Sequence, residues 1–294
     1  MERELAETTR VAKTVDEVRA FVAAARAARK VVGLVPTMGA LHEGHLALMR
    51  RAKSECGCVV VSVFVNPTQF GPSEDLERYP RDLDADVRKA GEVGVELVFA
   101  PEVETMYPRG DATFVEVTGT LTEGMCAPHR SGHFRGVTTV CARLFNIVGA
   151  DRAYFGEKDY QQLQIIKRMA RDLNFPLEIV PVATVREADG LAMSSRNAYL
   201  SPKEQKVATV IPRALREARE QFAAGEREAG TLVRTVERIV ASEPTVTMQY
   251  AELRDTETLA QVRRVERPAV LAVAAYVGKT RLIDNVVLRA GAAE

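Results

Sequence analysis

Two hydrophobic patterns alternate along the first 184 residues of the chain. Short runs rich in β-branched apolar residues are typical of buried parallel strands, and segments with apolar residues at helical spacing are typical of amphipathic helices. The alternating segment Thr113–Val117 is compatible with a further strand. The patterns predict strands at Val31–Val35, Val59–Val65, Val95–Phe99, Asp151–Phe155 and Leu177–Val182. They predict helices at Thr14–Lys30, after His45, at Asp82–Gly91, at Val137–Val148 and after Asp159 through Asp172.

This order of strands and helices predicts a doubly wound parallel sheet with right-handed crossovers, which is a Rossmann-like α/β fold. From residue 185 the pattern changes. Two long helical segments are followed by strands, the last two joined at the turn residues Gly278-Lys279. We therefore expect a larger domain over residues 1–184 and a smaller α+β domain over 185–294. The predicted elements of the second are helices Pro202–Gln221 and Thr231–Ser242 and strands Thr245–Leu253, Ala269–Val277 and Thr280–Leu288.

The stretch Pro36–His45 (PTMGALHEGH) joins a predicted strand to a predicted helix. Such junctions present helix N-terminal N–H groups that attract phosphate, and Gly39 and Gly44 allow close approach to the backbone. His42 and His45 share one face if the helix starts near Glu43. Phosphate binding is one interpretation; an ordinary α/β turn and a zinc site are the others. The stretch is neither a P-loop nor a GxGxxG fingerprint.

Polar residues also follow other predicted strands. Asn66 and Gln69 come after Val59–Val65, at a strand end where open α/β sheets bind ligands, although such residues also brace their own loops. A glycine and three charged residues, Gly156–Asp159, follow the predicted strand Asp151–Phe155. The segment Leu121–Gly136 is expected to be a lid or binding loop or a solvated surface, and its polar candidates are His129, Arg130, His133 and Arg135.

Composition excludes several classes of protein. Among 294 residues the hydrophobic fraction is 46%, enough for a packed core, and 40 basic residues balance 40 acidic ones. Zero net charge argues against a general nucleic-acid or membrane-surface binder. No apolar run is long enough for a membrane span, and the N-terminus lacks a signal-peptide core, so we expect a cytoplasmic protein. Four scattered cysteines predict reduced packing residues.

Five stretches then stand together in chain order: Pro36–His45, Val65–Phe70 (VNPTQF), His133–Val137 (HFRGV), Gly156–Gln162 (GEKDYQQ) and Val185–Asn197 (VREADGLAMSSRN). Together they resemble the pantothenate synthetase family, ligases that join pantoate to β-alanine using ATP in coenzyme A biosynthesis. The resemblance implies a nucleotidyltransferase-type Rossmann fold related to class I aminoacyl-tRNA synthetases, whose HIGH and KMSKS signatures HEGH and MSSRN resemble. It also implies a homodimer.

The resemblance implies site residues as well. His45 is similar to the family's proton donor, and His42, Lys158 and Arg196 are further catalytic candidates. Gln69 is similar to a pantoate and β-alanine contact and Gln162 to a second pantoate contact; Asn66 is a substrate-binding candidate by position. The implied ATP contacts are Met38, Gly39, Ala40, Leu41, His42, Glu43, Gly44, His45, Gly156, Glu157, Lys158, Asp159, Val185, Met193, Ser194, Ser195 and Arg196.

The implied chemistry suits these residue types. The pantoate carboxylate, already ionised at neutral pH, attacks the α-phosphorus of ATP and releases pyrophosphate; the β-alanine amine then displaces AMP from the pantoyl adenylate. The first step needs stabilisation of phosphate charge, which imidazoles, Lys158, Arg196 and Mg²⁺ would supply. The sequence identifies no base for the amine, and Asp84, Asp86 and Asp159 remain unranked as Mg²⁺ ligands.

Two other functions compete with this ligase. One is a nucleotidyltransferase of the same fold that acts on a phosphate ester, and the paired Gln69 and Gln162 argue against it. The other is a non-catalytic nucleotide-binding or RNA-binding module, against which zero net charge argues.

Overall fold

The computed structural model describes residues 9–72 and 74–289, which divide into two compact units. Within these residues, the first unit comprises the chain up to residue 117 together with 130–157 and 165–183. The second comprises 118–129, 158–164 and the chain from 184 onward. The last of these transitions lies at 183/184, and two short earlier segments, 118–129 and 158–164, belong to the second unit.

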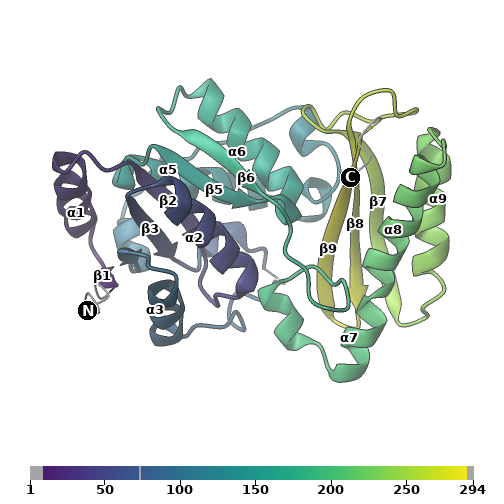
Figure 1. The fold of residues 1–294 in the computed structure, drawn as a ribbon, viewed down its shortest axis with the longest axis horizontal. Helices are drawn as coiled ribbons and strands as arrows, with labels where there is room; N and C mark the ends of the chain where they lie inside the picture. The colour runs from purple at the N-terminus through teal and green to yellow at the C-terminus, as the bar shows by residue number, and fades with distance from the viewer. Residues whose placement is uncertain (1–8, 73, 290–294) are drawn as a thin grey trace, which may run out of the picture. The chain divides into compact units, whose positions relative to one another are not determined.

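The first unit contains a six-stranded sheet within the described part of the chain (Figure 1). Its strand order is β1-β4-β3-β2-β5-β6, and every neighbouring pair is parallel. From β2 the chain winds outward through β3 and β4 on one side and then through β5 and β6 on the other, so the predicted doubly wound fold is confirmed. The strands are β1 Arg10–Ala12, β2 Val32–Thr37, β3 Cys58–Val63, β4 Leu97–Phe99, β5 Arg152–Gly156 and β6 Glu178–Val182.

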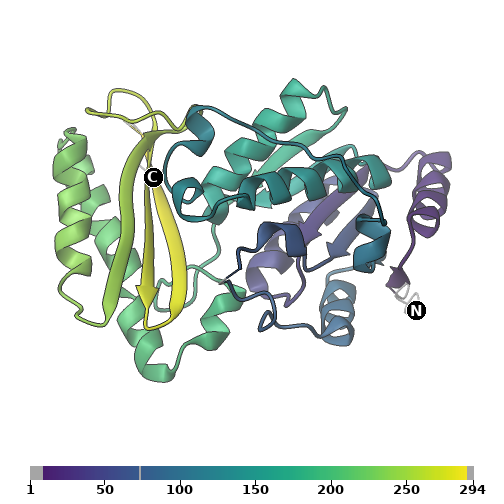
Figure 2. The ribbon, with the colours of Figure 1, turned by 180° about the vertical axis from the view of Figure 1, so that it is seen from behind.

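Helices cover both faces of this sheet. Helix α2 lies in front of it in Figure 1, and the opposite view in Figure 2 brings α5 to the front. Apolar residues of α2, including Met49 and Ala52, are fully buried against Val35, Val59 and Val61 of the central strands. The helices that begin in this part of the chain are α1 Val15–Ala27, α2 Glu43–Glu55, α3 Leu83–Glu92, α4 Val103–Met106, α5 His133–Val148 and α6 Tyr160–Asp172.

The second unit is built on an antiparallel sheet in the order β7-β8-β9. Helices α8 and α9 pack on one of its faces, where Ile211 and Leu232 are buried with Leu271 and Val273 of the central strand (Figure 1). The predicted hairpin is confirmed, with Gly278 at φ +57° in the turn. The elements are α7 Pro202–Ala208, α8 Val210–Ala223, α9 Ala229–Val240, β7 Val246–Asp255, β8 Ala269–Val277 and β9 Thr280–Leu288.

Three expected elements were wrong. The single helix Pro202–Gln221 is interrupted at Thr209, because Pro212 lacks an N–H and its ring excludes the carbonyl four residues earlier, so it sits in the first turn of a new helix. Thr113–Val117 is not a strand: Val115 bonds through its backbone to the threonine hydroxyls of α5 instead. The segment expected to be a loop to Gly136 is helical from His133.

The pattern analysis also missed the edge strand β1 and the one-turn helix α4, both too short to show a period. In the part of the chain that the structure describes, no helix is both long and apolar enough to cross a membrane. All four cysteines are free and buried, as expected for packing residues.

Candidate active site

The turn after β2 is held by a buried carboxylate from α3. Asp86 accepts hydrogen bonds from the backbone N–H groups of Ala40 (2.9 Å) and Leu41 (2.7 Å) and is 2% exposed. Burial raises the pKa of the Asp86 carboxyl, and the two N–H groups offset part of that rise. These bonds stabilise two positive φ angles, +83° at Gly39 and +50° at Ala40. A Cβ at Gly39 would lie 2.7 Å from the Asp86 carboxylate, so this position requires glycine.

Two imidazoles cap the helix that follows this turn. Helix α2 begins at Glu43, the start that the shared face of His42 and His45 requires, and its N-cap is His42. The backbone N–H of Gly44 donates to Nδ1 of His42 (3.1 Å), and the backbone N–H of His42 donates to Nδ1 of His45 (3.4 Å). The ring centroids lie 4.1 Å apart. A backbone N–H is always a donor, so each Nδ1 carries the lone pair and the neutral rings carry their proton on Nε2.

At the end of β3, Asn66 is enclosed by protein. Its Oδ1 accepts from the backbone N–H of Thr68 (3.3 Å) and from the Tyr107 hydroxyl (2.8 Å). Its Nδ2 donates to the carbonyl oxygen of Gly136 and to Oε1 of Gln69, each at 3.1 Å. Asn66 is 1% exposed, so its bonds to protein account for its burial.

These bonds determine which way the Gln69 amide faces. The Thr68 N–H must donate and the Gly136 carbonyl must accept, so the oxygen and nitrogen of Asn66 are assigned without ambiguity. Gln69 therefore turns its oxygen toward Asn66 and its Nε2 toward Met38, where it lies 3.1 Å from Sδ. The predicted substrate-binding amide and a predicted nucleotide-binding residue are thus neighbours, with the N–H₂ donors on the side of Met38.

The four polar candidates of residues 121–136 have different surroundings. His133 and Arg130 bond to the Gln69 segment in the first unit. In the same unit Arg135 lies over the Phe114 ring, 4.9 Å from its centroid. In the second unit His129 stacks on Tyr250 with centroids 5.9 Å apart. Only His133 and Arg130 are therefore tied to a predicted substrate-binding residue.

Gly156 ends β5, and the single turn Glu157–Asp159 follows it directly. In the second unit, the Lys158 ammonium lies 3.6 Å from the Asp159 carboxylate, and the Lys158 carbonyl accepts from Nδ2 of Asn285 (2.9 Å). The main chain of Lys158 is therefore fixed by β9, while its ammonium has an acidic neighbour.

The two glutamines of GEKDYQQ have different surroundings. Gln161 is 4% exposed and braces the segment before it: its Oε1 accepts from the Cys126 N–H (2.8 Å), and its Nε2 donates to the carbonyls of Leu121 and Gly124. Gln162, the predicted pantoate contact, is partly exposed. The bracing role of Gln161 was not visible in the sequence, where the two residues look alike.

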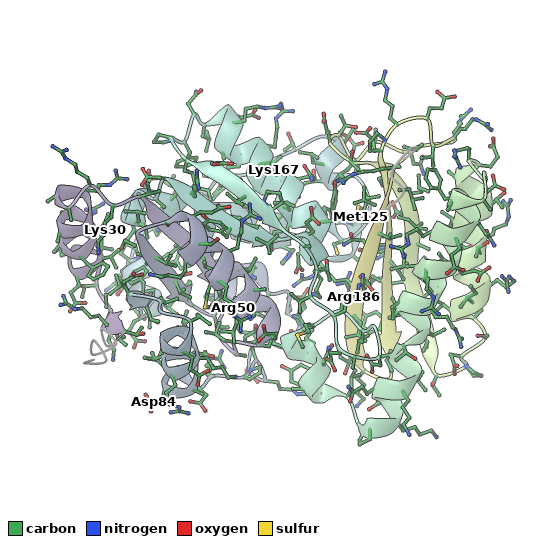
Figure 3. All side chains as sticks on the ribbon, in the orientation of Figure 1. Lys30, Arg50, Asp84, Met125, Lys167 and Arg186 are labelled. Carbon is green, nitrogen blue, oxygen red and sulfur yellow. The ribbon has the colours of Figure 1, made fainter. Side chains whose placement is uncertain are left out.

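The predicted nucleotide-binding stretch at 185–196 forms a tight hairpin. The Val185 carbonyl accepts from the Met193 N–H (3.0 Å), and Ser194 caps the short turn Ser195–Tyr199 through the Arg196 N–H (3.3 Å). Arg186, labelled beside β9 in Figure 3, anchors the hairpin through an ion pair with buried Asp284 (2.7 Å).

Asn197, which follows this stretch, also belongs to the hairpin. Its Nδ2 donates to the Glu187 carboxylate (2.7 Å) and to the Ala192 carbonyl (3.1 Å). Its Oδ1 is buried and has no hydrogen-bond partner among the described residues. An acceptor in that state suits a donor from a bound molecule, and sequence reasoning had not selected it.

Potential metal ligands are dispersed. Across residues 9–72 and 74–289, no group of three or more His, Cys, Asp or Glu side chains is placed to hold a metal ion. His42 and His45 use Nδ1 for capping, and the zinc alternative therefore lacks a ligand set. Of the three aspartates considered for Mg²⁺, Asp86 is engaged by two backbone amides, and Asp84 is exposed on α3.

Comparisons with known proteins agree with one another. The family model described as pantoate-beta-alanine ligase matches residues 10–287. Pantothenate synthetase of Pelotomaculum thermopropionicum is 54% identical over 95% of this chain and 98% of its own, and that of Rubrobacter xylanophilus is 56% identical over 92% and 96%.

Solved structures are similar as well. Pantothenate synthetase of Thermus thermophilus is 50% identical and superposes with a TM-score of 0.90 over 95% of this chain and 99% of its own. The pantoate-beta-alanine ligase of Francisella tularensis, solved with a β,γ-ATP compound and β-alanine, is 30% identical with a TM-score of 0.77 over 95% and 97%.

Proposed function

The chain belongs to the pantoate–β-alanine ligase family, and from that premise we propose how its residues carry out the reaction. The protein is an ATP-dependent ligase that forms pantothenate from pantoate and β-alanine. The observation that carries the residue-level proposal is the pair of imidazoles that cap α2 with Nδ1 and so hold their protons on Nε2.

The proposed reaction has two steps. A carboxylate oxygen of pantoate bonds to the α-phosphorus of ATP, and the bond to the β-phosphate oxygen breaks to release pyrophosphate. The β-alanine nitrogen then bonds to the acyl carbon of the adenylate; AMP leaves, and the amine loses a proton. The carboxylate needs no base, so the first step depends on stabilising charge on phosphate oxygens.

His42 and His45 are proposed to bind the triphosphate. Both Nε2–H groups are hydrogen-bond donors, and they stand at a helix N-terminus, whose dipole favours negative charge. His45 is also the proposed proton donor to the leaving pyrophosphate. Lys158 and Arg196 are proposed to add positive charge at the reacting phosphate, where charge develops only in the transition state.

The remaining nucleotide contacts are proposed separately for each unit. In the first, Met38–His45 would meet the nucleotide through a turn whose backbone is already set by Asp86, and Gly156 and Glu157 would do so at the end of β5. In the second unit, the proposed nucleotide contacts are Lys158, Asp159 and the hairpin from Val185 to Arg196. The buried Asn197 Oδ1 beside that hairpin supports a bound partner there.

Gln69 is proposed to donate to pantoate and later to the carboxylate of β-alanine, because its Nε2 faces away from the amide that holds its oxygen. Gln162 is the proposed second pantoate contact. For Asn66 we propose a positioning role in place of direct substrate contact, since its groups bond to Thr68, Tyr107, Gly136 and Gln69.

Mg²⁺ is proposed to arrive with ATP, held mainly by its phosphates. Mg²⁺ in nucleotide enzymes typically uses one or two carboxylates with substrate phosphates, and the dispersed acidic side chains of the described residues fit that arrangement better than a protein cage. The ion would neutralise phosphate charge. A homodimer in the cytoplasm is proposed from the family resemblance.

Oxygen-isotope transfer tests the proposed chemistry. Pantoate carrying ¹⁸O in its carboxylate is incubated with ATP, Mg²⁺ and β-alanine, and the products are read by mass spectrometry. Attack on the α-phosphorus places one ¹⁸O in AMP and none in pyrophosphate. Label in inorganic phosphate would instead indicate an acyl phosphate, and the adenylate proposal would be wrong. Pyrophosphate release that requires pantoate also separates this enzyme from a nucleotidyltransferase acting on phosphate esters and from an RNA-binding module.

A further inference from the structure

We propose that His133, oriented by Arg130 and Glu74, is a positioning residue for Gln69. The inference rests on the proposed function, in which Gln69 contacts pantoate and β-alanine. It extends that function to three residues whose hydrogen bonds lead to the main-chain carbonyl of Gln69.

The hydrogen bonds have one consistent direction. The Glu74 carboxylate accepts from Nε (2.8 Å) and from an Nη (2.5 Å) of Arg130, a bidentate pair. The other Nη of Arg130 lies 2.9 Å from Nε2 of His133, and Nδ1 of His133 lies 2.8 Å from the Gln69 carbonyl oxygen. Arginine only donates and a carbonyl only accepts, so His133 is neutral with its proton on Nδ1. Glu74 and Arg130 thus select the tautomer that Gln69 requires.

The burial of these groups makes the orientation firm. His133 is 7% exposed, and the side chains of Arg130 and Glu74 are 12% and 21% exposed. Solvent screens such a pair much less than an exposed one. A flip of the His133 ring would put a ring carbon in the place of each nitrogen and break both hydrogen bonds, which opposes the change.

Gln69 needs this support because the turn that carries it is weak. The turn Pro67–Gln69 is a single 3₁₀ turn, closed by long bonds from Gln69 N–H to the Asn66 carbonyl (3.4 Å) and from Phe70 N–H to the Pro67 carbonyl (3.2 Å). The first turn of α5 supplies two further fixed points: the His133 ring on the Gln69 carbonyl, and the Gly136 carbonyl on Asn66, which holds the Gln69 amide.

The test compares His133→Asn with His133→Leu, which have similar size. The asparagine amide reaches the position of Nδ1 and can still donate to the Gln69 carbonyl, whereas leucine cannot. Melting temperature, kcat and KM for each substrate are measured on both variants and on Gln69→Ala. We expect His133→Leu to raise KM for pantoate and β-alanine about tenfold, the scale of one lost hydrogen bond, with KM for ATP within about twofold. His133→Asn should recover most of that loss.

The outcomes separate the inference from its premise. If Gln69→Ala raises KM for pantoate but His133→Leu does not, the positioning role is wrong and the proposed contact stands. If Gln69→Ala leaves both KM values unchanged, the contact proposed for Gln69 is wrong, and the inference fails with it. A lower melting temperature of His133→Leu with all KM values unchanged shows a purely structural role. If His133→Leu does not fold, His133→Gln replaces it, since its longer amide reaches Nε2 and not Nδ1.

Discussion

At the residue scale, the role proposed for the histidines of HEGH gives each side chain two functions through different atoms. Nδ1 of each ring accepts a backbone N–H and stabilises the start of α2, while the proton of the neutral ring is on Nε2, the proposed donor to an anion. The two properties can therefore be separated by substitution. A side chain that keeps an acceptor at the Nδ1 position but has no group at the Nε2 position should keep the stability of the helix start and lose the proposed anion binding.

Substitutions at His42 test this separation. Asparagine is a good N-cap and can accept the Gly44 N–H, but it has no group at the Nε2 position. We expect His42→Asn to keep the melting temperature and to lose pantoate-dependent pyrophosphate release by about 10²-fold or more. His42→Ala should lose both, with about 1 kcal/mol of stability lost with the cap. Near-normal turnover of folded His42→Asn would contradict the anion-binding role.

Lys158→Ala should reduce the rate of adenylate formation more than it weakens ATP binding. The proposed contact strengthens as charge develops, and loss of one such contact typically costs ~3–4 kcal/mol of transition-state stabilisation. Single-turnover rates and ATP titration by calorimetry measure the two effects. Lys203→Ala, which removes an exposed ammonium from α7, is the control and should change neither. An unchanged rate with only weaker ATP binding would refute this role for Lys158.

At the scale of elements, the first turn of α5 is a support for the segment after β3. Gly136 has no Cβ, and a Cβ there would clash with the backbone of Thr68 and Gln69. Helix propensity and packing therefore predict opposite effects of Gly136→Ala on stability. Propensity alone would stabilise the helix, since alanine is favoured over glycine by up to about 1 kcal/mol, whereas the clash would destabilise it.

We expect packing to decide at this position. Gly136→Ala should lower the melting temperature and raise KM for pantoate, because the clash involves backbone atoms that cannot rotate away. Gly230→Ala in α9 is the matched control, since its Cβ would meet only the flexible Arg234 side chain, and it should be neutral or stabilising. A stable Gly136→Ala variant with unchanged KM would show that the α5 contact is not required for substrate binding.

At the scale of the whole molecule, several exposed carboxylates are more acidic in the folded protein. Backbone N–H groups of Lys13 and Thr14 lower the pKa of Glu17, the Arg50 side chain lowers that of Glu43, and Ser201 lowers that of Glu204. Each lowered pKa stabilises the folded state, and this stabilisation is complete at pH values above 4.5, the ordinary pKa of a glutamate. It is lost as the pH falls through the pKa of the folded state, where the folded carboxylate is protonated as well. Asp86 has the opposite effect on stability. Burial raises the pKa of its carboxyl, so ionisation of this group at pH values above 3.8 destabilises the folded state.

The carboxylates with lowered pKa outnumber Asp86 in this set, so the melting temperature should decrease as pH falls below about 4.5. Circular dichroism melts between pH 3 and 7 measure this. Glu17→Gln removes one titrating group from the capping box of α1, and the decrease should be smaller for this variant. A melting temperature that rises on acidification would mean that buried groups such as Asp86 dominate the proton linkage.

The sequence by itself determined what depends on neighbouring residues. Hydrophobic periodicity reports which face of an element is buried, so it located the parallel strands from β2 to β6, the helix that follows Pro36–His45 and the final hairpin. The motifs, compared as strings, were enough to indicate the family. The break at Pro212 was also a local signal, and attention to its missing N–H would have divided the long helix.

Only the tertiary structure decided the partners of polar groups. Asp86 is 46 residues from Ala40, and His133 is 64 residues from Gln69, and neither separation leaves a trace in a periodic pattern. A hydrogen bond depends on a few atoms meeting at about 3 Å, and the residues that meet are chosen by how helices pack on the sheet. For the same reason Gln161 and Gln162, adjacent and identical in sequence, have different surroundings, because successive side chains of a helix point about 100° apart and only one of them faces the segment it braces.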